Sequence, residues 1–245
     1  MAIGPFRMPP PPAMTHAQTL DIGQGTVSRV FDVMKSLEEP SSKKNKAGIN
    51  RLAASTYDQA AWITVLTRLA TRATAGLESL PGAVKSETDV ALQANQSALS
   101  NKIRENLEMY VLEDFRKRID VAVAWLCEEW YNDKVQMRAK QSAILHYEKW
   151  TLRILDRITP FLDKKDKILM RFLSEIPEVG TEVFNKIQAL CRNPEMVNLA
   201  LTSLLYLVMM KPPARDMALD TMEDIWRNCM LSFSRHYYLL TYDYS

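Results

Sequence analysis

The sequence predicts an all-α protein, an α-solenoid of HEAT/ARM-like stacked helix hairpins with a flexible N-terminal arm. Apolar residues recur at helical spacing over most of the chain, and no alternating β-branched run extends beyond a few positions. Glycine is scarce, at 7 of 245 residues, which favours long helices over a turn-dense β fold. A unit of helix, proline corner and helix also occurs twice in the C-terminal half.

The more distinct copy spans residues 193–226. Asn193 is expected to cap a helix that begins at Pro194, because its side-chain oxygen accepts an orphan amide and proline needs no donor there. This helix is apolar nearly all round, so it must be covered on more than one side. Pro212 and Pro213 end it, and a second amphipathic helix follows.

An upstream copy lies 35 residues earlier. A period of roughly 35 to 45 residues made of helix pairs is typical of HEAT or armadillo repeats. Two unrelated hairpins in a plain helical bundle are the alternative. The matched positions are Leu169, Phe172, Leu173, Pro177, Val183, Phe184, Ile187, Leu190 and Cys191, which correspond in order to Leu204, Leu207, Val208, Pro212, Ala218, Leu219, Met222, Ile225 and Trp226.

Residues 1–50 are predicted to be a proline-rich arm, a leading helix and a polar connector. The prolines at 9–12 favour an extended spacer over a ligand for a proline-binding module. A helix is expected over 19–37, firmly only from Thr26, because Gly23 and Gly25 weaken its start. The lysine-containing connector at 38–50 is interpreted as a solvated loop rather than a phosphate contact.

Residues 51–228 are predicted to form one helical-repeat domain, interrupted by a flexible insertion at about 78–100. Its first helix is expected to open at Ser55, where Asp58 completes a capping box. The insertion is small, polar and without aromatic residues. The predicted buried stripe of the first helix is Trp62, Leu66, Leu69, Ala73 and Leu77.

One long helix, with a possible kink, is predicted over 99–135. Trp125 lies on its far side and is expected to pack against a neighbouring helix, with an exposed partner anchor as the alternative. A further helix is expected at about 143–162, and Asp163 is expected to cap the helix that contains Ile168. The buried positions are predicted to be Ile103, Leu107, Val111, Phe115, Ile119, Ala122, Leu126 and Trp130, then Ile144, Ile154, Leu155, Ile158 and Phe161.

Composition argues against several classes of function. Lys and Arg total 31 and Asp and Glu total 29, so no large basic footprint for nucleic acid or membrane exists. Three cysteines and three histidines are scattered, which predicts neither a disulfide framework nor a metal site. The longest apolar run, 199–210, is too short for a bilayer, and no signal peptide is seen, so a soluble intracellular protein is expected.

No constellation of catalytic residues is recognisable. Glu128 and Glu129 are adjacent and point in different directions on a helix, and His146 has Glu148 nearby but no nucleophile. The glycines never form a phosphate-binding loop. The sequence therefore predicts a protein that is not an enzyme, with no cofactor and no small-molecule substrate.

Several segments of the chain form one extended pattern rather than a short motif. They are 9–12, 50–54, 72–78, 114–133 (DFRKRIDVAVAWLCEEWYND), 159–163 with 166–167, 171–178 (RFLSEIPE), 191–195 (CRNPE) and 210–216 (MKPPARD). These segments resemble symplekin-family proteins of fungi, and together they resemble the C-terminal domain of that family. The resemblance covers about residues 5–78 and 103–227.

The resemblance implies a non-catalytic scaffold subunit of the nuclear pre-mRNA 3′-end cleavage and polyadenylation complex. It implies binding of the C-terminal regions of the endonuclease subunit and its inactive paralogue. Family members are longer, with an N-terminal HEAT-repeat domain that docks a phosphatase, and that function is expected to be lost or to lie on another polypeptide. Residues 229–245, with four tyrosines, form an atypical tail that does not resemble the family.

Two kinds of binding surface follow. For a protein partner, the predicted contacts are Trp125, Trp130, Tyr131, Arg171, Lys211 and Arg215. For direct RNA binding, the alternative function, a basic ridge would join Lys164, Lys165 and Lys167 to the same arginines and lysine of the two repeat corners. The balanced net charge and the interleaved Asp163, Asp166, Glu175 and Asp216 argue against that ridge.

Overall fold

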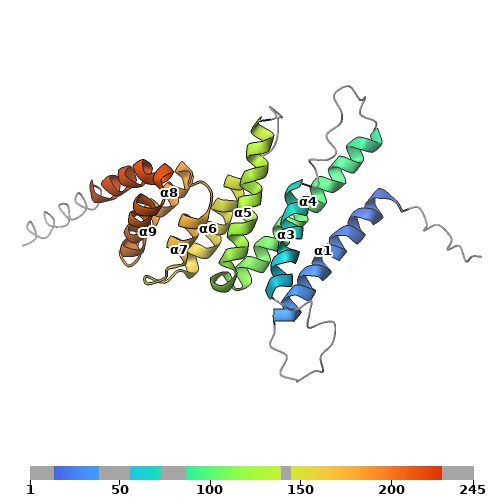
Figure 1. Ribbon diagram of the computed structural model, residues 1–245, viewed down its shortest axis with the longest axis horizontal. Helices are drawn as coiled ribbons and strands as arrows, with labels where there is room; N and C mark the ends of the chain where they lie inside the picture. Colours follow the sequence, from blue (N-terminus) through green and yellow to red (C-terminus); the bar gives the residue numbers. More distant parts are fainter. Residues whose placement is uncertain (1–13, 39–55, 73–86, 139–144, 228–245) are drawn as a thin grey trace, which may run out of the picture. The chain divides into compact units, whose positions relative to one another are not determined.

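The computed structural model describes residues 14–38, 56–72, 87–138 and 145–227 (Figure 1). Within these ranges every regular element is an α-helix or a short 3-10 helix, which confirms the all-α class. The chain divides into two compact units, with the boundary between Asn106 and Leu107 inside helix α4. The predictions for the proline-rich arm, the polar connector, the Ser55–Asp58 capping box and the tail at 229–245 lie outside the described residues or side chains.

The first unit contains α1 (His16–Glu38), α3 (Thr56–Arg72) and the first part of α4 (Glu87–Glu113). Helix α1 begins well before Thr26, since Thr15 and Gln18 form a reciprocal capping box. Thr15 N donates to Gln18 Oε1 at 3.0 Å, and Gln18 N donates to Thr15 Oγ1 at 3.3 Å. This cap compensates for the two glycines and extends the predicted helix toward the N-terminus.

The predicted stripe of α3 is confirmed at Leu66 and wrong at Trp62 and Leu69, while Ala73 and Leu77 lie outside the described residues. Trp62 and Leu69 are each 49% exposed. The buried side of the helix carries two threonines whose hydroxyls donate to backbone carbonyls, Thr67 to Thr64 and Thr71 to Thr67, both at 2.9 Å. A pattern that counts only apolar residues misses such self-satisfied threonines. The buried positions of α3 are Ile63, Leu66, Thr67, Ala70 and Thr71.

The predicted flexible insertion is wrong over residues 87–100, which belong to α4. Its Ala, Leu, Gln and Glu residues are strong helix formers. Ser100, the last residue of the predicted insertion, is buried by a polar contact. Its hydroxyl donates to the carbonyl of Ala70, and Arg104 donates to Ser100 at 2.7 Å. The apolar pattern therefore does not reveal it.

The predicted long helix over 99–135 is divided in two. Helix α4 ends at Glu113, and α5 spans Phe115–Arg138, with a further kink at Arg118, where φ is −103° and ψ is 17°. The predicted inner face continues across this break. All eight of its positions are buried except Trp130, which is half-buried.

The second unit continues as helix hairpins. Helix α6 (Tyr147–Ile158) and the 3-10 turn η1 (Thr159–Phe161) lead to α7 (Ile168–Glu175) and α8 (Thr181–Leu190). Then come α9 (Val197–Met210), the turn η2 (Pro212–Ala214) and a helix over 215–227.

Contacts within this unit follow the order of a repeat. Helix α7 contacts both α5 and α9, α6 contacts α5, and α8 contacts α9 (Figure 1). The first helices of successive hairpins therefore lie in one row, the helical-repeat arrangement of a solenoid. Leu169, Phe172 and Leu173 are fully buried, as are Leu204 and Leu207 of the next copy.

Three local predictions in this unit are wrong. Helix α9 begins at Val197 rather than Pro194, because the Asn193 side chain accepts the amide of Glu195, at 3.1 Å, in a turn before the helix. Asp163 does not cap α7; Asp166 Oδ1 accepts the amide of Ile168 at 3.1 Å. Phe161, predicted to be buried, is 67% exposed.

Candidate partner-binding surface

The first proline corner explains one predicted contact residue. In an α-helix the carbonyl of residue i accepts the amide of residue i+4. Pro177 has no N–H, so the carbonyl of Leu173 lacks that donor. The Lys211 ammonium supplies it from the next repeat, with Nζ 3.3 Å from Leu173 O and 3.4 Å from Ser174 O. It also donates to the carbonyl of Ile176.

The second corner repeats this solution. Pro212 lies four residues after Val208 and again removes a donor. Arg215 Nε donates to Val208 O at 3.1 Å. Lys211 and Arg215 thus satisfy carbonyls at the two matching corners, and burial lowers the pKa of Lys211 below its ordinary value. Their contact with a partner stays a prediction.

Arg171 links two helices of the row. Its guanidinium donates to Asp120 of α5 and, at 2.9 Å, to Glu175 Oε1 one turn along α7. The hydrogen bond to Glu175, followed by the charge of Asp120, raises the pKa of Arg171. The side chain is partly exposed, but its charge is already paired.

Trp125, one of the predicted partner contacts, does not lie on the surface. The side chain is fully buried, its Nε1 donates to Glu129 Oε1 at 2.8 Å, and its ring centroid lies 5.1 Å from that of Trp150. The prediction that Trp125 packs against a neighbouring helix is confirmed, and its assignment as a partner anchor is wrong. A residue at 0% exposure cannot contact another chain in this conformation.

Trp130 and Tyr131 differ in what they offer a partner. Trp130 is half-buried, and its Nε1 donates to Glu178 Oε2 at 2.8 Å. Lys134 pairs with the same oxygen at 2.8 Å, and these two donors lower the pKa of Glu178. Tyr131 is 53% exposed, and Val135, one turn further along α5, is also exposed. The exposed aromatic at this end of α5 is therefore Tyr131.

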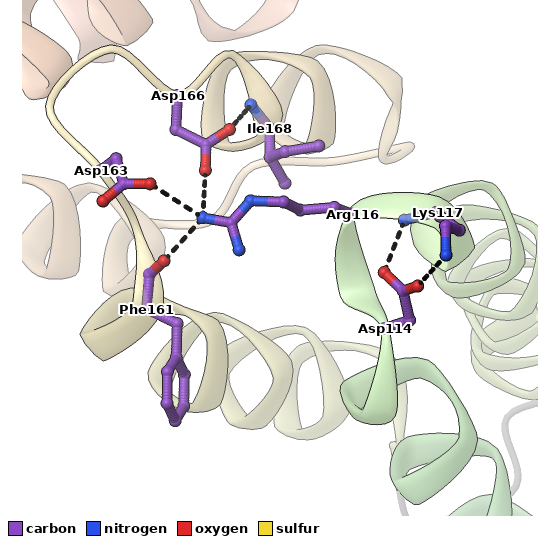
Figure 2. Close-up of polar contacts among 7 residues, drawn as sticks. All are labelled: Asp114, Arg116, Lys117, Phe161, Asp163, Asp166 and Ile168. Carbon is purple, nitrogen blue, oxygen red and sulfur yellow. Dashed lines mark hydrogen bonds and ion pairs between the residues drawn. The ribbon is translucent and has the colours of Figure 1, made fainter.

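A cluster around Arg116 holds the corner between η1 and α7, and no motif in the sequence reveals it. Arg116 Nη2 donates to the carbonyl of Phe161 at 2.9 Å, to Asp163 Oδ2 at 3.2 Å and to Asp166 Oδ2 at 2.9 Å (Figure 2). Figure 2 shows the Phe161 ring pointing away from the guanidinium. The backbone of Phe161 is held while its ring stands exposed.

The α4–α5 break beside this cluster is stabilised separately. Lys117 pairs with Asp114 Oδ2 at 2.7 Å, and its amide donates to Asp114 Oδ1 at 3.4 Å (Figure 2). These contacts lower the pKa of Asp114, chiefly through the side-chain hydrogen bond to Lys117. Asp114 therefore acts as a cap at the start of α5.

The last described hairpin carries the remaining exposed apolar side chains of the second repeat. On α9 these side chains are Leu205, Met209 and Met210, and Met209 is 65% exposed. On the helix over 215–227 they are Leu219 and Trp226. The repeat alignment alone does not predict the exposure of Leu219, because Phe184, the matching residue of the upstream copy, is buried.

The predicted basic ridge is interrupted. Arg171 is paired with two carboxylates, whereas Lys211 and Arg215 use donors on backbone carbonyls and keep their charges. Lys164, Lys165 and Lys167 are exposed, and Asp163 and Asp166 lie among them. Within the described ranges, no three His, Cys, Asp or Glu side chains gather as a metal site would require, and no helix could cross a membrane.

These features define a helical-repeat protein whose surface chemistry suits recognition. The chain is similar to the mRNA cleavage and polyadenylation specificity factor complex subunit pta1 of Schizosaccharomyces pombe. The two are 29% identical over 217 residues, which is 84% of this chain and 32% of pta1. The chain thus spans about a third of the length of this curated relative. No family model matches it, and no solved structure matches it.

Proposed function

We propose that the chain is a symplekin-family protein that acts in pre-mRNA 3′-end processing as a non-catalytic scaffold in the nucleus. The observation that carries this proposal is the similarity to pta1, which extends over 84% of the chain rather than over one motif. The helical-repeat arrangement supports it, because stacked hairpins present extended surfaces for binding.

Its partners are the other subunits of the cleavage and polyadenylation complex, in particular the C-terminal regions of the endonuclease and its inactive paralogue. Exposed aromatic residues on a held backbone are suited to this role, since aromatic anchors carry much of the energy of protein interfaces. Tyr131 and Phe161 meet that description, and both are more than half exposed.

The test is affinity purification of the full chain from nuclear extract of its source, followed by quantitative mass spectrometry. Scaffold function predicts recovery of both endonuclease subunits after nuclease treatment. The double variant Tyr131→Ala with Phe161→Ala should recover less of them, whereas Trp62→Ala, an exposed aromatic of the first unit, serves as the matched control. Recovery of neither subunit by the unmodified chain would refute the partner assignment.

Direct RNA binding is the second candidate, and one observation favours it. The exposed Phe161 ring lies in the same segment as Lys164, Lys165 and Lys167, and an aromatic ring with nearby cations is a common platform for single-stranded RNA. RNA affinity should then fall steeply with salt. Replacing the three lysines by glutamine should abolish it without changing recovery of protein subunits.

A further inference from the structure

The helix over 215–227 exposes both apolar and acidic side chains on its solvent side. Leu219 is 47% exposed and Trp226 is 64% exposed, and they lie two turns apart on the same side of the helix. The adjacent side, about 100° around the helix, is turned into the unit, where Ala218 and Ile225 are buried. The helix is thus fixed on one side and apolar on the exposed surface beside it.

The repeat alignment shows that this exposure is specific to the last described copy. The position equivalent to Leu219 in the upstream copy is Phe184, which is 3% exposed, and the position equivalent to Trp226 is Cys191, which is half-buried. Apolar residues at these positions are covered when another hairpin follows, as α9 follows and contacts α8. Among the described residues, which end at Arg227, Leu219 and Trp226 remain exposed.

Charge beside the apolar pair indicates what kind of cover fits. Asp216, Asp220 and Asp224 recur every four residues and are all exposed, so they form an acidic row on the solvent side of the helix, which comes closest to the apolar pair where Asp216 lies one turn before Leu219.

The two arginines of this helix offset that row only in part. Arg227 pairs with Glu223 at 2.6 Å, and Arg215, which donates to the uncharged carbonyl of Val208, adds one positive charge against three aspartates. The face therefore combines apolar anchors with a negative charge that a partner can complement.

We propose that Leu219, Trp226 and this acidic row form a docking face for a basic amphipathic helix of a protein partner. Such a helix would place apolar residues spaced three, four and seven apart on the Leu219–Trp226 stripe. Its Lys or Arg residues would lie against the aspartates, which adds specificity and speeds association. This proposal rests on the proposed function, because it takes the partner to be a protein. It adds that the partner's segment at this face is a basic amphipathic helix.

Two full-length variants and two controls test the proposal. Leu219→Ala with Trp226→Ala removes the anchors, and Trp62→Ala again removes an exposed tryptophan elsewhere. Asp216, Asp220 and Asp224 changed to Lys reverse the row. The matched charge control changes three exposed glutamates, Glu105, Glu182 and Glu195, to Lys.

The probes are a designed Leu/Lys amphipathic helical peptide and its Leu/Glu counterpart, measured by fluorescence anisotropy. The chain should bind the basic peptide, and the anchor variant and the row variant should each bind it about tenfold more weakly or worse. The controls should bind it as the unmodified chain does, and the acidic peptide should not bind. Equal binding of the basic peptide by all variants would overturn the proposal.

Other occupants of the face give distinct outcomes, each of which would overturn the proposal. Cover by another part of this chain predicts that the anchor variant melts more than about 3 °C lower, whereas exposed residues should leave the melting temperature nearly unchanged. Cover by a second copy predicts a dimer in light scattering that the anchor variant abolishes.

Failure of the face and failure of the proposed function are distinguishable. If the anchor variant recovers both endonuclease subunits from nuclear extract but no longer binds the basic peptide, the face serves another partner of the same chemistry. If it recovers the subunits and binds the peptide as the unmodified chain does, the docking face is refuted and the scaffold function stands. If the unmodified chain recovers no subunit, the scaffold function is refuted while the peptide measurement still decides the face.

Discussion

Replacing Lys211 with methionine tests whether the proline corners depend on cations for their stability. Methionine keeps most of the aliphatic stem but removes the ammonium donor. The substitution leaves the carbonyls of Leu173 and Ile176 without their side-chain partner, and both residues are at most 1% exposed. Because Pro177 cannot donate, no backbone amide at i+4 replaces the lost bond to Leu173.

The expected loss follows from the balance of two effects. A hydrogen bond from a charged donor contributes about 1.5 to 3 kcal/mol, and an unsatisfied buried acceptor costs about 1 to 3 kcal/mol. Burial of the ammonium offsets part of this gain, as the lowered pKa of Lys211 shows. We therefore expect Lys211→Met to lower the free energy of unfolding by about 1 to 3 kcal/mol.

Urea denaturation followed by circular dichroism measures the change, with Lys165→Met as the control. Lys165 is exposed in the segment before α7, so its replacement should change stability by less than about 0.5 kcal/mol. Amide exchange at the end of α7 should also accelerate in the Lys211 variant. A change in Lys211→Met no larger than the control would refute the capping role.

The pH dependence of the same variant provides a second readout. The folded-state pKa of Lys211 lies below its unfolded value of 10.5, so the unfolded chain binds more protons between the two pKa values. Lys211 therefore makes stability rise with pH in that window. The difference in stability between the unmodified chain and Lys211→Met should increase as pH rises toward 10.5, and a decrease would contradict the sign of this argument.

Three further predictions concern the core and the caps of the second unit. Leu173→Ala and Leu207→Ala should each lower the unfolding free energy by about 2 to 5 kcal/mol, because both side chains are fully buried; unchanged melting curves would show that they are not core residues. Asp133→Ala should cost about 1 to 2 kcal/mol in the same assay, since Asp133 Oδ2 accepts the amides of His146 and Tyr147 at 2.9 and 2.8 Å and caps α6; an effect near zero would contradict the cap. Burial raises the pKa of Tyr147 from 10.0 to about 12, so the folded state retains a proton that the unfolded state loses, and stability should fall as pH rises from about 10 to about 12. The stability of the Tyr147→Phe variant should fall less over this pH range. An equal dependence of stability on pH in the two chains would refute the raised pKa of Tyr147.

The all-α class and most buried positions could be predicted because the spacing of apolar residues follows the buried face of each helix. The face from Ile103 to Leu126 shows this best, since its residues stay inward even where the backbone breaks at Asp114. The proline corners at Pro177 and Pro212 were equally visible as matching positions of a repeat. The spacing of apolar residues is enough to predict a buried position when the surroundings of the side chain are uniformly apolar.

Polar contacts explain most of the failures. The buried side of α3 depends on threonines that bond to their own helix, and α4 contacts α3 through the Ser100 hydroxyl in its middle. The Thr15–Gln18 capping box is legible in the sequence and would have placed the start of α1 correctly.

The contacts that the predicted partner-binding cations make within the chain could not be predicted for a related reason. A sequence pattern assigns Arg215, Lys211 and Arg171 to the surface. Arg215 donates to the carbonyl of Val208, seven residues earlier, whereas Lys211 and Arg171 also have partners 35 and 51 residues away. Such partners, like those of Arg116, appear only when the repeats are stacked. The exposed anchors, by contrast, resemble core residues in the sequence, as Trp226 does.

The most direct test of the scaffold function is calorimetric titration of the full chain with the purified C-terminal regions of the endonuclease and its paralogue, and separately with single-stranded RNA, at low and high salt. We predict a stoichiometric complex with the protein regions whose affinity changes little with salt, because apolar anchors dominate it, and no comparable RNA binding. Tight RNA binding that weakens steeply with salt, with no heat from the protein regions, would contradict it.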